Sequence, residues 1–348
     1  MAGFDDMAGK RPSRGRIFAR GLRHVLAGRF LGRGPFLISH LITARCFARC
    51  PTCLWRGECP EAAAGRVLAF YNSAREAGFV STNFWGGEPL LREDLPEILK
   101  GCHRLGFVTG VVTNGYLLAE RCNEIVPWLD HLVISLDLPS AAHDDLRGVP
   151  GLFGRALAGI EQARRLNGRM KLLLNAVVSR YSHPGVLGLV DLAGSLGTTV
   201  TFEVPDEGLP RFRPGEGEIR SRLPEAEERA AFRELLRRKA AGAPINNSRT
   251  YLRAVAEGRL RYPCHLPQAC LRIGPDGRVG NCLHPDRPLG NVFTSGLREI
   301  LDGAAARELV RETAHCSRCT DTAAFETSLF WSLHPEVAAN TLKLFLTS

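Results

Sequence analysis

Residues 80–137, VSTNFWGGEPLLREDLPEILKGCHRLGFVTGVVTNGYLLAERCNEIVPWLDHLVISLD, contain three short apolar runs rich in β-branched residues, separated by two longer amphipathic segments. The runs typical of strands are residues 80–85, 108–113 and 131–137, and the helical segments are residues 94–105 and 119–127. Strands that alternate with helices at this interval form right-handed βαβ units and a parallel sheet. The stretch therefore predicts an α/β fold.

The same alternation continues on both sides of this stretch. Further strands are predicted at residues 35–43, 171–178 and 199–205, and further helices at residues 60–78, 153–166 and 186–196. Six parallel strands in 348 residues predict a partial (β/α)6 TIM barrel. In such a barrel the active site lies at the C-terminal ends of the strands.

Polar motifs occur at those predicted strand ends. They are Gly86-Gly87-Glu88-Pro89, Thr113-Asn114-Gly115, Ser135-Leu136-Asp137, Asn175 and Glu203. Each motif alone has an ordinary reading as a turn or a helix cap. Their joint placement on successive strands indicates one binding site instead.

The loop after the first predicted strand carries Cys46, Cys50 and Cys53, spaced C-x3-C-x2-C. Three thiolates on one short loop can hold three irons of a [4Fe–4S] cube and leave the fourth iron without a protein ligand. The alternative is a closed zinc site with Cys59 as the fourth thiolate. Eleven cysteines without a secretory signal favour a reducing compartment, the cytoplasm, over a disulfide framework.

A second set of cysteines lies near the C-terminus. Residues 271–279 predict a β-hairpin with an Asp276-Gly277 turn, which brings the flanking cysteines together. Four ligands follow from this arrangement: Cys264, Cys282, Cys316 and Cys319. Cys270 is a spare thiol or a substitute for one of them. A closed zinc centre is a serious alternative to a second cluster here.

The net charge of +9 is concentrated at the start of the chain, because no acidic residue lies between Asp6 and Glu58. Residues 14–31 predict a basic amphipathic helix. It either docks on the fold with a solvated basic face or contacts an anionic membrane surface, such as the inner face of the cell membrane. Nucleic-acid binding is disfavoured, since the segment lacks interleaved aromatic residues and any recognised module. No run of eighteen apolar residues predicts a membrane span.

Together these motifs resemble the radical S-adenosylmethionine (SAM) superfamily over nearly the whole chain after residue 35. The matching motifs are Cys46-x3-Cys50-x2-Cys53, WGGEPLLR at 85–92, TNG at 113–115, VISLD at 133–137, His143-Asp144 and Arg147-Gly148. The run Cys264…Gly277-x4-Cys282…Cys316-x2-Cys319 resembles the twitch module, the short relative of the SPASM module. No cysteine follows Cys319, so a third cluster is not expected.

The resemblance implies two [4Fe–4S] clusters and SAM as cofactors. Cys46, Cys50 and Cys53 would bind the SAM cluster, and the four C-terminal cysteines the auxiliary cluster. The implied SAM contacts are Thr52, Gly86, Gly87, Glu88, Ser135, Arg147 and Asn175. Thr52 departs from the aromatic residue usual at its position. A reductant such as flavodoxin or ferredoxin would supply the electron that cleaves SAM to a 5′-deoxyadenosyl radical, which abstracts hydrogen from the substrate.

The resemblance and the composition together predict four parts of the chain. These are a basic N-terminal segment (1–34), a radical SAM core (35–213), a charged helical linker (214–258) and the auxiliary module (259–348). The predicted substrate is a small or lipid-like metabolite, which undergoes net oxidation or bond formation. A peptide substrate and a non-catalytic iron–sulfur or zinc protein are the alternatives. No general acid or base is identified.

Overall fold

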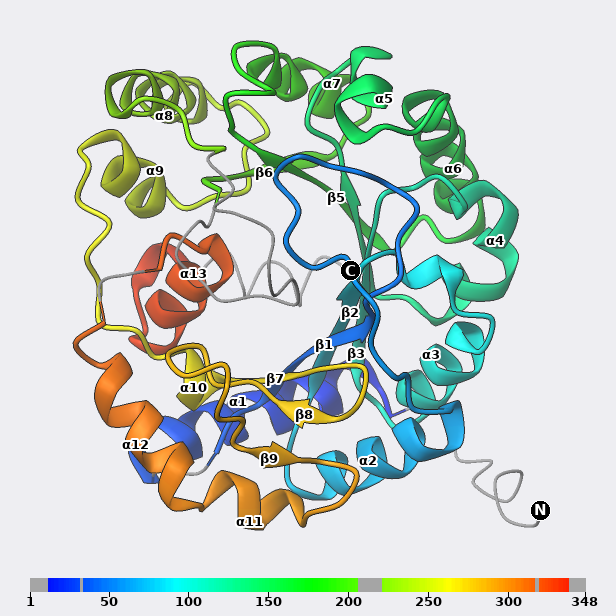
Figure 1. Cartoon of the computed structure of the whole chain (residues 1–348), viewed down its shortest axis with the longest axis vertical. Coiled ribbons are helices and arrows are strands. Elements are labelled where there is room, and N and C mark those ends of the chain that lie inside the picture. The colour runs from blue at the N-terminus through cyan, green and yellow to red at the C-terminus, as the bar shows by residue number, and fades with distance from the viewer. Residues whose placement is uncertain (1–11, 32–33, 206–220, 317–318, 338–348) are drawn as a thin grey trace.

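The computed structural model describes residues 12–31, 34–205, 221–316 and 319–337. Six parallel strands form a partial barrel, in the spatial order β6-β5-β4-β3-β2-β1 (Figure 1). They are β1 (Leu37–Thr43), β2 (Ser81–Gly86), β3 (Val108–Thr113), β4 (His131–Ser135), β5 (Lys171–Val177) and β6 (Thr199–Glu203). The predicted α/β partial barrel is therefore confirmed.

Helices cover the outer face of this sheet (Figure 1). They are α2 (Ala64–Glu76), α3 (Leu95–Arg104), α4 (Leu118–Ile125), α5 (Ala142–Arg147), α6 (Leu152–Leu166) and α7 (Leu189–Ser195), with 3-10 turns η1 (Pro89–Leu91), η2 (Val126–Trp128) and η3 (Gly185–Gly188). Short α5 is absent from the predicted elements. The helix predicted at 60–78 begins only at Ala64, and the one predicted at 186–196 begins as η3.

Strand side chains alternate between the helices and the barrel interior. On β5, Leu172, Leu174 and Ala176 are buried under the helices. Asn175 and its neighbours two residues away point the other way, because successive side chains of a strand face opposite sides of a sheet. The alternation of side chains along each strand therefore places the apolar core on one face of the sheet and the lining of the barrel interior on the other.

The predicted C-terminal hairpin is part of the same sheet. β7 (Cys270–Ile273) pairs in parallel with β1, with Cys270 opposite Leu37, and β8 (Arg278–Val279) and β9 (Gly290–Asn291) follow in antiparallel order. The turn has Gly277 at φ 84°, a conformation that favours glycine. The result is one nine-stranded sheet. The sequence pattern predicts the hairpin but not its pairing with β1.

The helices that follow β6 are α8 (Glu225–Ala240), α9 (Arg249–Ala256), α10 (Leu266–Ala269), α11 (Leu297–Leu301), α12 (Ala304–Thr313) and α13 (Thr322–Trp331). Of these, α8, α9 and α13 lie on the open side of the barrel between β6 and β7, and α11 and α12 lie beside the hairpin (Figure 1). The segment predicted as a charged linker packs closely on β6. The Asn247 side chain accepts a hydrogen bond from Phe202 N (2.8 Å) and donates one to Phe202 O (2.9 Å).

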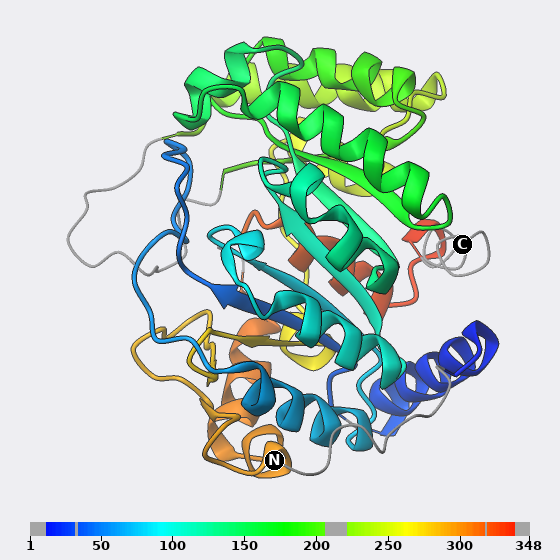
Figure 2. The same ribbon diagram turned by 90° about the vertical axis from the view of Figure 1, so that its right-hand side faces the viewer.

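Helix α1 (Arg14–Leu31) lies at the end of the barrel where the strands begin (Figure 2). One face is docked, with Ile17 and Val25 buried. The opposite face leaves Leu22, Leu26 and Phe30 exposed, at 48%, 39% and 66% of their surface. The helix is therefore docked and still presents an apolar stripe to the surface. Within the described residues, no helix combines the length and apolarity needed to cross a membrane.

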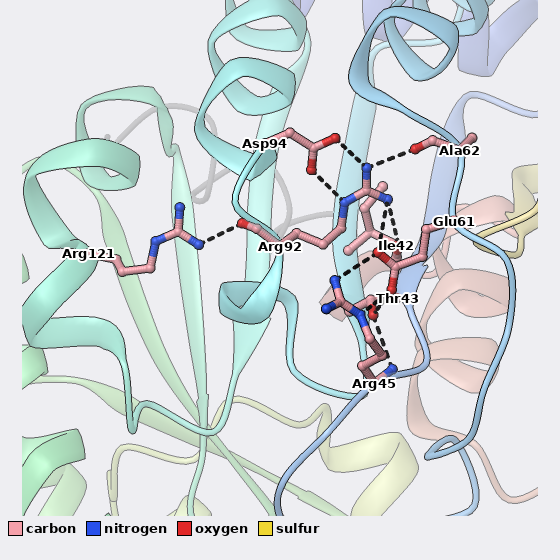
Figure 3. A network of polar contacts seen from close by, with 8 residues as sticks. All are labelled: Ile42, Thr43, Arg45, Glu61, Ala62, Arg92, Asp94 and Arg121. Carbon is pink, nitrogen blue, oxygen red and sulfur yellow. Dashed lines mark hydrogen bonds and ion pairs between the residues drawn. The ribbon is translucent and has the colours of Figure 1, made fainter.

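A buried arginine joins three segments where the cysteine loop begins and ends (Figure 3). The Arg92 side chain is 3% exposed and donates to Ile42 O (3.0 Å) and Ala62 O (2.8 Å). It also pairs through two hydrogen bonds with the Asp94 carboxylate (2.8 and 2.7 Å). These bonds connect the end of β1, the chain before α2 and the start of α3. They fix both ends of the segment that carries the cysteines.

Replacing Arg92 with Met should lower the free energy of unfolding by about 3–5 kcal/mol, because Asp94 and two backbone carbonyls lose a buried partner. Anaerobic urea unfolding followed by circular dichroism measures the change. The matched control is Arg237→Met, which removes an arginine 70% exposed and paired with Glu234, and it should change little. Equal losses in both variants would contradict the proposed importance of the Arg92 network.

Candidate active site

A cavity of about 750 Å³ lies inside the partial barrel. Residues from β1 to β7 and from α13 line it. On β4 the lining residues are His131, Val133 and Ser135, which are spaced two apart as the strand geometry requires. The cavity therefore lies on the interior face of the sheet and reaches the C-terminal strand ends.

The cysteine loop after β1 forms one wall of this cavity, and Cys46, Cys50 and Cys53 all line it. Arg49 N donates to Arg147 O (2.8 Å) and so attaches the loop to the end of α5. Burial raises the pKa of the Cys46 thiol to about 12. It also raises the pKa of Cys50, while the charge of Arg147 acts in the opposite direction. The thiols of Cys46 and Cys50 are thus protonated near neutral pH, and a bound metal would displace their protons.

Two glycines allow β2 to approach the cysteine loop. Gly87 N donates to Thr43 O (2.8 Å), and Glu88 N donates to Arg45 O (2.8 Å). A Cβ atom on Gly86 would overlap the Thr43 carbonyl oxygen, and one on Gly87 would overlap that of Arg45. Only glycine fits at either position while these backbone contacts are kept.

The donor set fits an iron–sulfur cube better than a single metal ion. In the described part of the chain, no three Cys, His, Asp or Glu side chains come together as a site for a single metal ion. A cube binds each cysteine to a different iron, so its thiolates do not have to meet at one point. Cys59, the fourth ligand of the zinc alternative, lies near Asp276 and Arg278 of the hairpin and is not among the cavity-lining residues.

Glu88 joins the ends of β2 and β3 and is not among the residues that line the cavity. Its carboxylate is fully buried and accepts hydrogen bonds from Leu90 N (3.0 Å), Asn114 N (2.8 Å) and the Thr113 hydroxyl (2.7 Å). Burial raises the pKa of Glu88, and these three donors act against that rise. The side chain predicted to contact SAM therefore holds the strand ends that surround the cavity.

Arg147 projects a fixed charge at the same end of the cavity. Its guanidinium donates twice to Asp137 Oδ2 (2.9 and 2.7 Å), and Asp137 Oδ1 accepts from Val177 N (2.9 Å). The charges of Asp137 and Cys50 raise the pKa of Arg147 against the effect of burial. The pair fixes a cation close to Cys50, where it suits an anionic ligand.

The structure brings most of the predicted site residues to the one cavity. Those that line it, besides the three cysteines, are Thr52, Gly86, Gly87, Ser135, Arg147 and Asn175.

Sequence reasoning did not select several other residues of the wall, including Asn83, Trp55, Trp85, Asn246, Arg272, Asp321 and Glu326. Trp55 and Trp85 meet edge to face at 4.8 Å, and Trp85 Nε1 donates to Ser39 Oγ (2.8 Å). Reading every second residue back from the strand ends would have found Asn83. The residues of α13 carry no such local signal.

The C-terminal cysteines gather beside the hairpin. Cys264 is buried, and Cys282, Cys316 and Cys319 are partly buried. Burial raises the pKa of Cys282 to about 11, with smaller contributions from Cys264 and Cys316. Cys264 packs in one apolar cluster with Cys270 and Cys319. A second cavity of about 720 Å³ is lined by Cys270, Cys282 and Arg272. The four thiols of Cys264, Cys282, Cys316 and Cys319 have the donor chemistry of a cubane centre, in which each cysteine binds a different iron.

Comparisons with known proteins agree with this arrangement. Residues 41–178 match the radical SAM superfamily, and residues 264–320 match SPASM, an iron–sulfur cluster-binding domain. A probable GTP 3′,8-cyclase of Saccharolobus solfataricus is 26% identical over 71% of this chain and 79% of its own length.

Two solved structures share the fold. Streptococcus suis SuiB bound to precursor peptide SuiA has a TM-score of 0.65 at 17% identity, over 97% of this chain and 82% of its own. Native anSMEcpe with bound AdoMet and Cp18Cys peptide has a TM-score of 0.64 at 13% identity, over 88% of this chain and 99% of its own.

Replacing Glu88 with Gln should destabilise the fold by about 1–3 kcal/mol, because an amide cannot accept from all three donors. Urea unfolding measures the loss. Glu161→Gln, at an exposed position paired with Arg165, is the matched control and should change stability little. A Glu88→Gln variant as stable as the parent would contradict the role of Glu88 in joining the strand ends.

Proposed function

Because the chain belongs to the radical SAM superfamily and carries a C-terminal SPASM iron–sulfur domain, we propose that Cys46, Cys50 and Cys53 bind the SAM cluster of this enzyme. The supporting observation is that the three thiols and the Gly86-Gly87 strand end border one cavity. Three cysteines leave one iron of the cube free for SAM. When bound, the cluster and SAM together supply a 5′-deoxyadenosyl radical that abstracts hydrogen from the substrate.

The residues of the cavity wall hold and orient SAM in this proposal. Arg147, fixed by Asp137, pairs with the SAM carboxylate. The backbone at Gly86 and Gly87 receives the methionine amino group, and the backbone of Thr52 receives the adenine. Ser135 contacts the ribose, and Asn175 lines the SAM site. Glu88 acts indirectly, by fixing the Thr113 and Asn114 strand end.

The second cluster is proposed to bind Cys264, Cys282, Cys316 and Cys319. Four thiolates leave no iron free to bind substrate, so this cluster transfers electrons. An electron-transfer role fits net oxidation or bond formation in the substrate. Cys270, which pairs in β7 with Leu37, stays a spare thiol in this assignment.

The substrate is proposed to be a small or lipid-like metabolite. A cavity of about 750 Å³ would have to hold the cluster and SAM as well as the substrate, and small-molecule sites alone typically take roughly 300–1,000 Å³. The space that remains therefore suits a small substrate. Its described wall mixes aromatic and aliphatic side chains with Asn83, Asn246 and Glu326. Such a wall binds an apolar body with a few polar groups.

The charge of the wall does not favour a nucleoside triphosphate, although the curated relatives are named probable GTP 3′,8-cyclases. Arg147 and Arg272 are already paired with Asp137 and Asp321. The acidic residues on the described wall are Asp130, Glu203, Asp321 and Glu326. Lys171, the third Lys or Arg side chain of the described wall, lies where β5 begins, at the other end of the cavity from the cysteine loop. The four phosphate charges of a nucleoside triphosphate would therefore face acidic residues and paired arginines on this described wall.

We assign the parts of the chain accordingly. Residues 35–213 form the radical SAM core and 259–348 the auxiliary module, while 214–258 support β6.

Residues 1–34 include helix α1, which we propose contacts the inner face of a membrane. Its exposed Leu22, Leu26 and Phe30 lie beside the basic residues Arg16, Arg23 and Arg29. An apolar stripe flanked by cations suits anionic lipid. The enzyme would act in the cytoplasm with a flavodoxin or ferredoxin as reductant.

Cys50→Ala should abolish 5′-deoxyadenosine formation by the anaerobically reconstituted enzyme and lower its iron content from about eight to about four per chain. Cys59→Ser is the control for the zinc alternative, and it should keep both 5′-deoxyadenosine formation and the iron content of the parent. Chromatography of the nucleoside and iron and zinc analysis provide the measurements. Bound zinc without deoxyadenosine in the parent protein would contradict the proposed function.

The double variant Leu26→Ser/Phe30→Ser should bind vesicles of equal phosphatidylcholine and phosphatidylglycerol at least tenfold more weakly than the parent, since about 1.5–3 kcal/mol is lost per buried side chain. Co-sedimentation measures the binding. The control Leu166→Ser removes another exposed leucine beside Arg164 and Arg165. Equal binding by all three proteins, or no binding by the parent, would exclude lipid contact through α1.

A further inference from the structure

Arg272 and Asp321 form an ion pair in the wall between the two cavities. Arg272 lies on β7 opposite Ser39 and lines both cavities. Asp321 lies two residues after Cys319 and lines the first cavity. The two side chains are 25% and 21% exposed, and the guanidinium donates to Asp321 Oδ2.

Both partners are held in place from their own elements. Asp321 Oδ1 accepts from Ala323 N (2.8 Å) and Ala324 N (3.2 Å) at the start of α13. Arg272 is paired within β7, and its carbonyl accepts from Gly280 N (2.9 Å). The guanidinium therefore keeps one position, at the border of the substrate cavity and the second cysteine set.

Among the described lining residues, Arg272 is the cation that the two cavities share, and it lines the second cavity together with Cys270 and Cys282. Arg272 lies two residues after Cys270 on β7, and its partner Asp321 lies two residues after Cys319. Arg278, on the same hairpin and also paired with an aspartate, is 66% exposed. It lies near Cys59 instead. Arg272 and Arg278 thus carry the same charge and lie on the same hairpin. They differ in burial and in the cysteines near them, which are Cys270 and Cys282 for Arg272 and Cys59 for Arg278.

We propose that Arg272 raises the reduction potential of the second cluster and that Asp321 partly offsets this effect. The inference rests on the proposed function, in which Cys264, Cys282, Cys316 and Cys319 bind that cluster. The reduced cluster carries one more negative charge than the oxidised one, so a nearby cation stabilises the reduced form. The effect is strong only where water does not screen the charges. A higher potential suits a cluster that accepts an electron.

The experiment isolates the second cluster in full-length protein that carries Cys46→Ala, Cys50→Ala and Cys53→Ala. Redox titration followed by electron paramagnetic resonance gives the midpoint potential. Arg272→Gln should change the ratio of reduced to oxidised cluster about tenfold at a fixed potential, a decrease of about 59 mV for one electron. Asp321→Asn, which still caps α13, should raise the potential. Arg272→Lys and the control Arg278→Gln should leave it nearly unchanged.

The outcomes separate this inference from the proposed function. A normal second-cluster signal with equal potentials in Arg272→Gln and Arg278→Gln would overturn the role of Arg272. A decrease in potential in Asp321→Asn would also overturn it. No second-cluster signal in the background protein, which should hold about four irons, would overturn the proposed ligands and with them this inference.

Discussion

The close backbone contact between the cysteine loop and the end of β2 is the constraint on which the site depends. Thr43 and Arg45 accept hydrogen bonds from Gly87 and Glu88. Glycine is required at 86 and 87, because any Cβ would occupy the space of a carbonyl oxygen. Arg92 fixes the two ends of the loop through Ile42 O and Ala62 O. The three thiols consequently face the cavity from a backbone that has little freedom to move.

A second constraint is the parallel pairing of β7 with β1. It makes the C-terminal hairpin a continuation of the barrel sheet, so both cysteine sets are placed by one hydrogen-bonded framework. The helix α13 then closes the side of the barrel between β6 and β7. Because Arg272 and Asp321 come from these two elements, the wall between the cavities is built where the C-terminal part meets the barrel.

Polar residues in the motifs have two kinds of role that sequence alone does not distinguish. Arg147 lines the cavity and is positioned by Asp137. Glu88, from an equally specific motif, uses its carboxylate to bind three donors in the protein interior. Burial makes this difference, since a buried carboxylate has to find its hydrogen bonds within the protein. Burial also separates the charged segment after residue 220 from a simple linker, because its apolar residues Phe232 and Leu235 pack into the core.

The sequence by itself determined the six parallel strands, the bounds of α1, the hairpin turn and the two cysteine sets. These features follow from local periodicity, glycine geometry and ligand spacing, which are present in short segments. Only the tertiary structure decided that β7 pairs with β1, that the segment between α8 and α9 bonds to β6, and that Arg272 meets Asp321. Those contacts join residues far apart in the chain, and their partners are selected by packing and burial, for which no short segment carries a pattern.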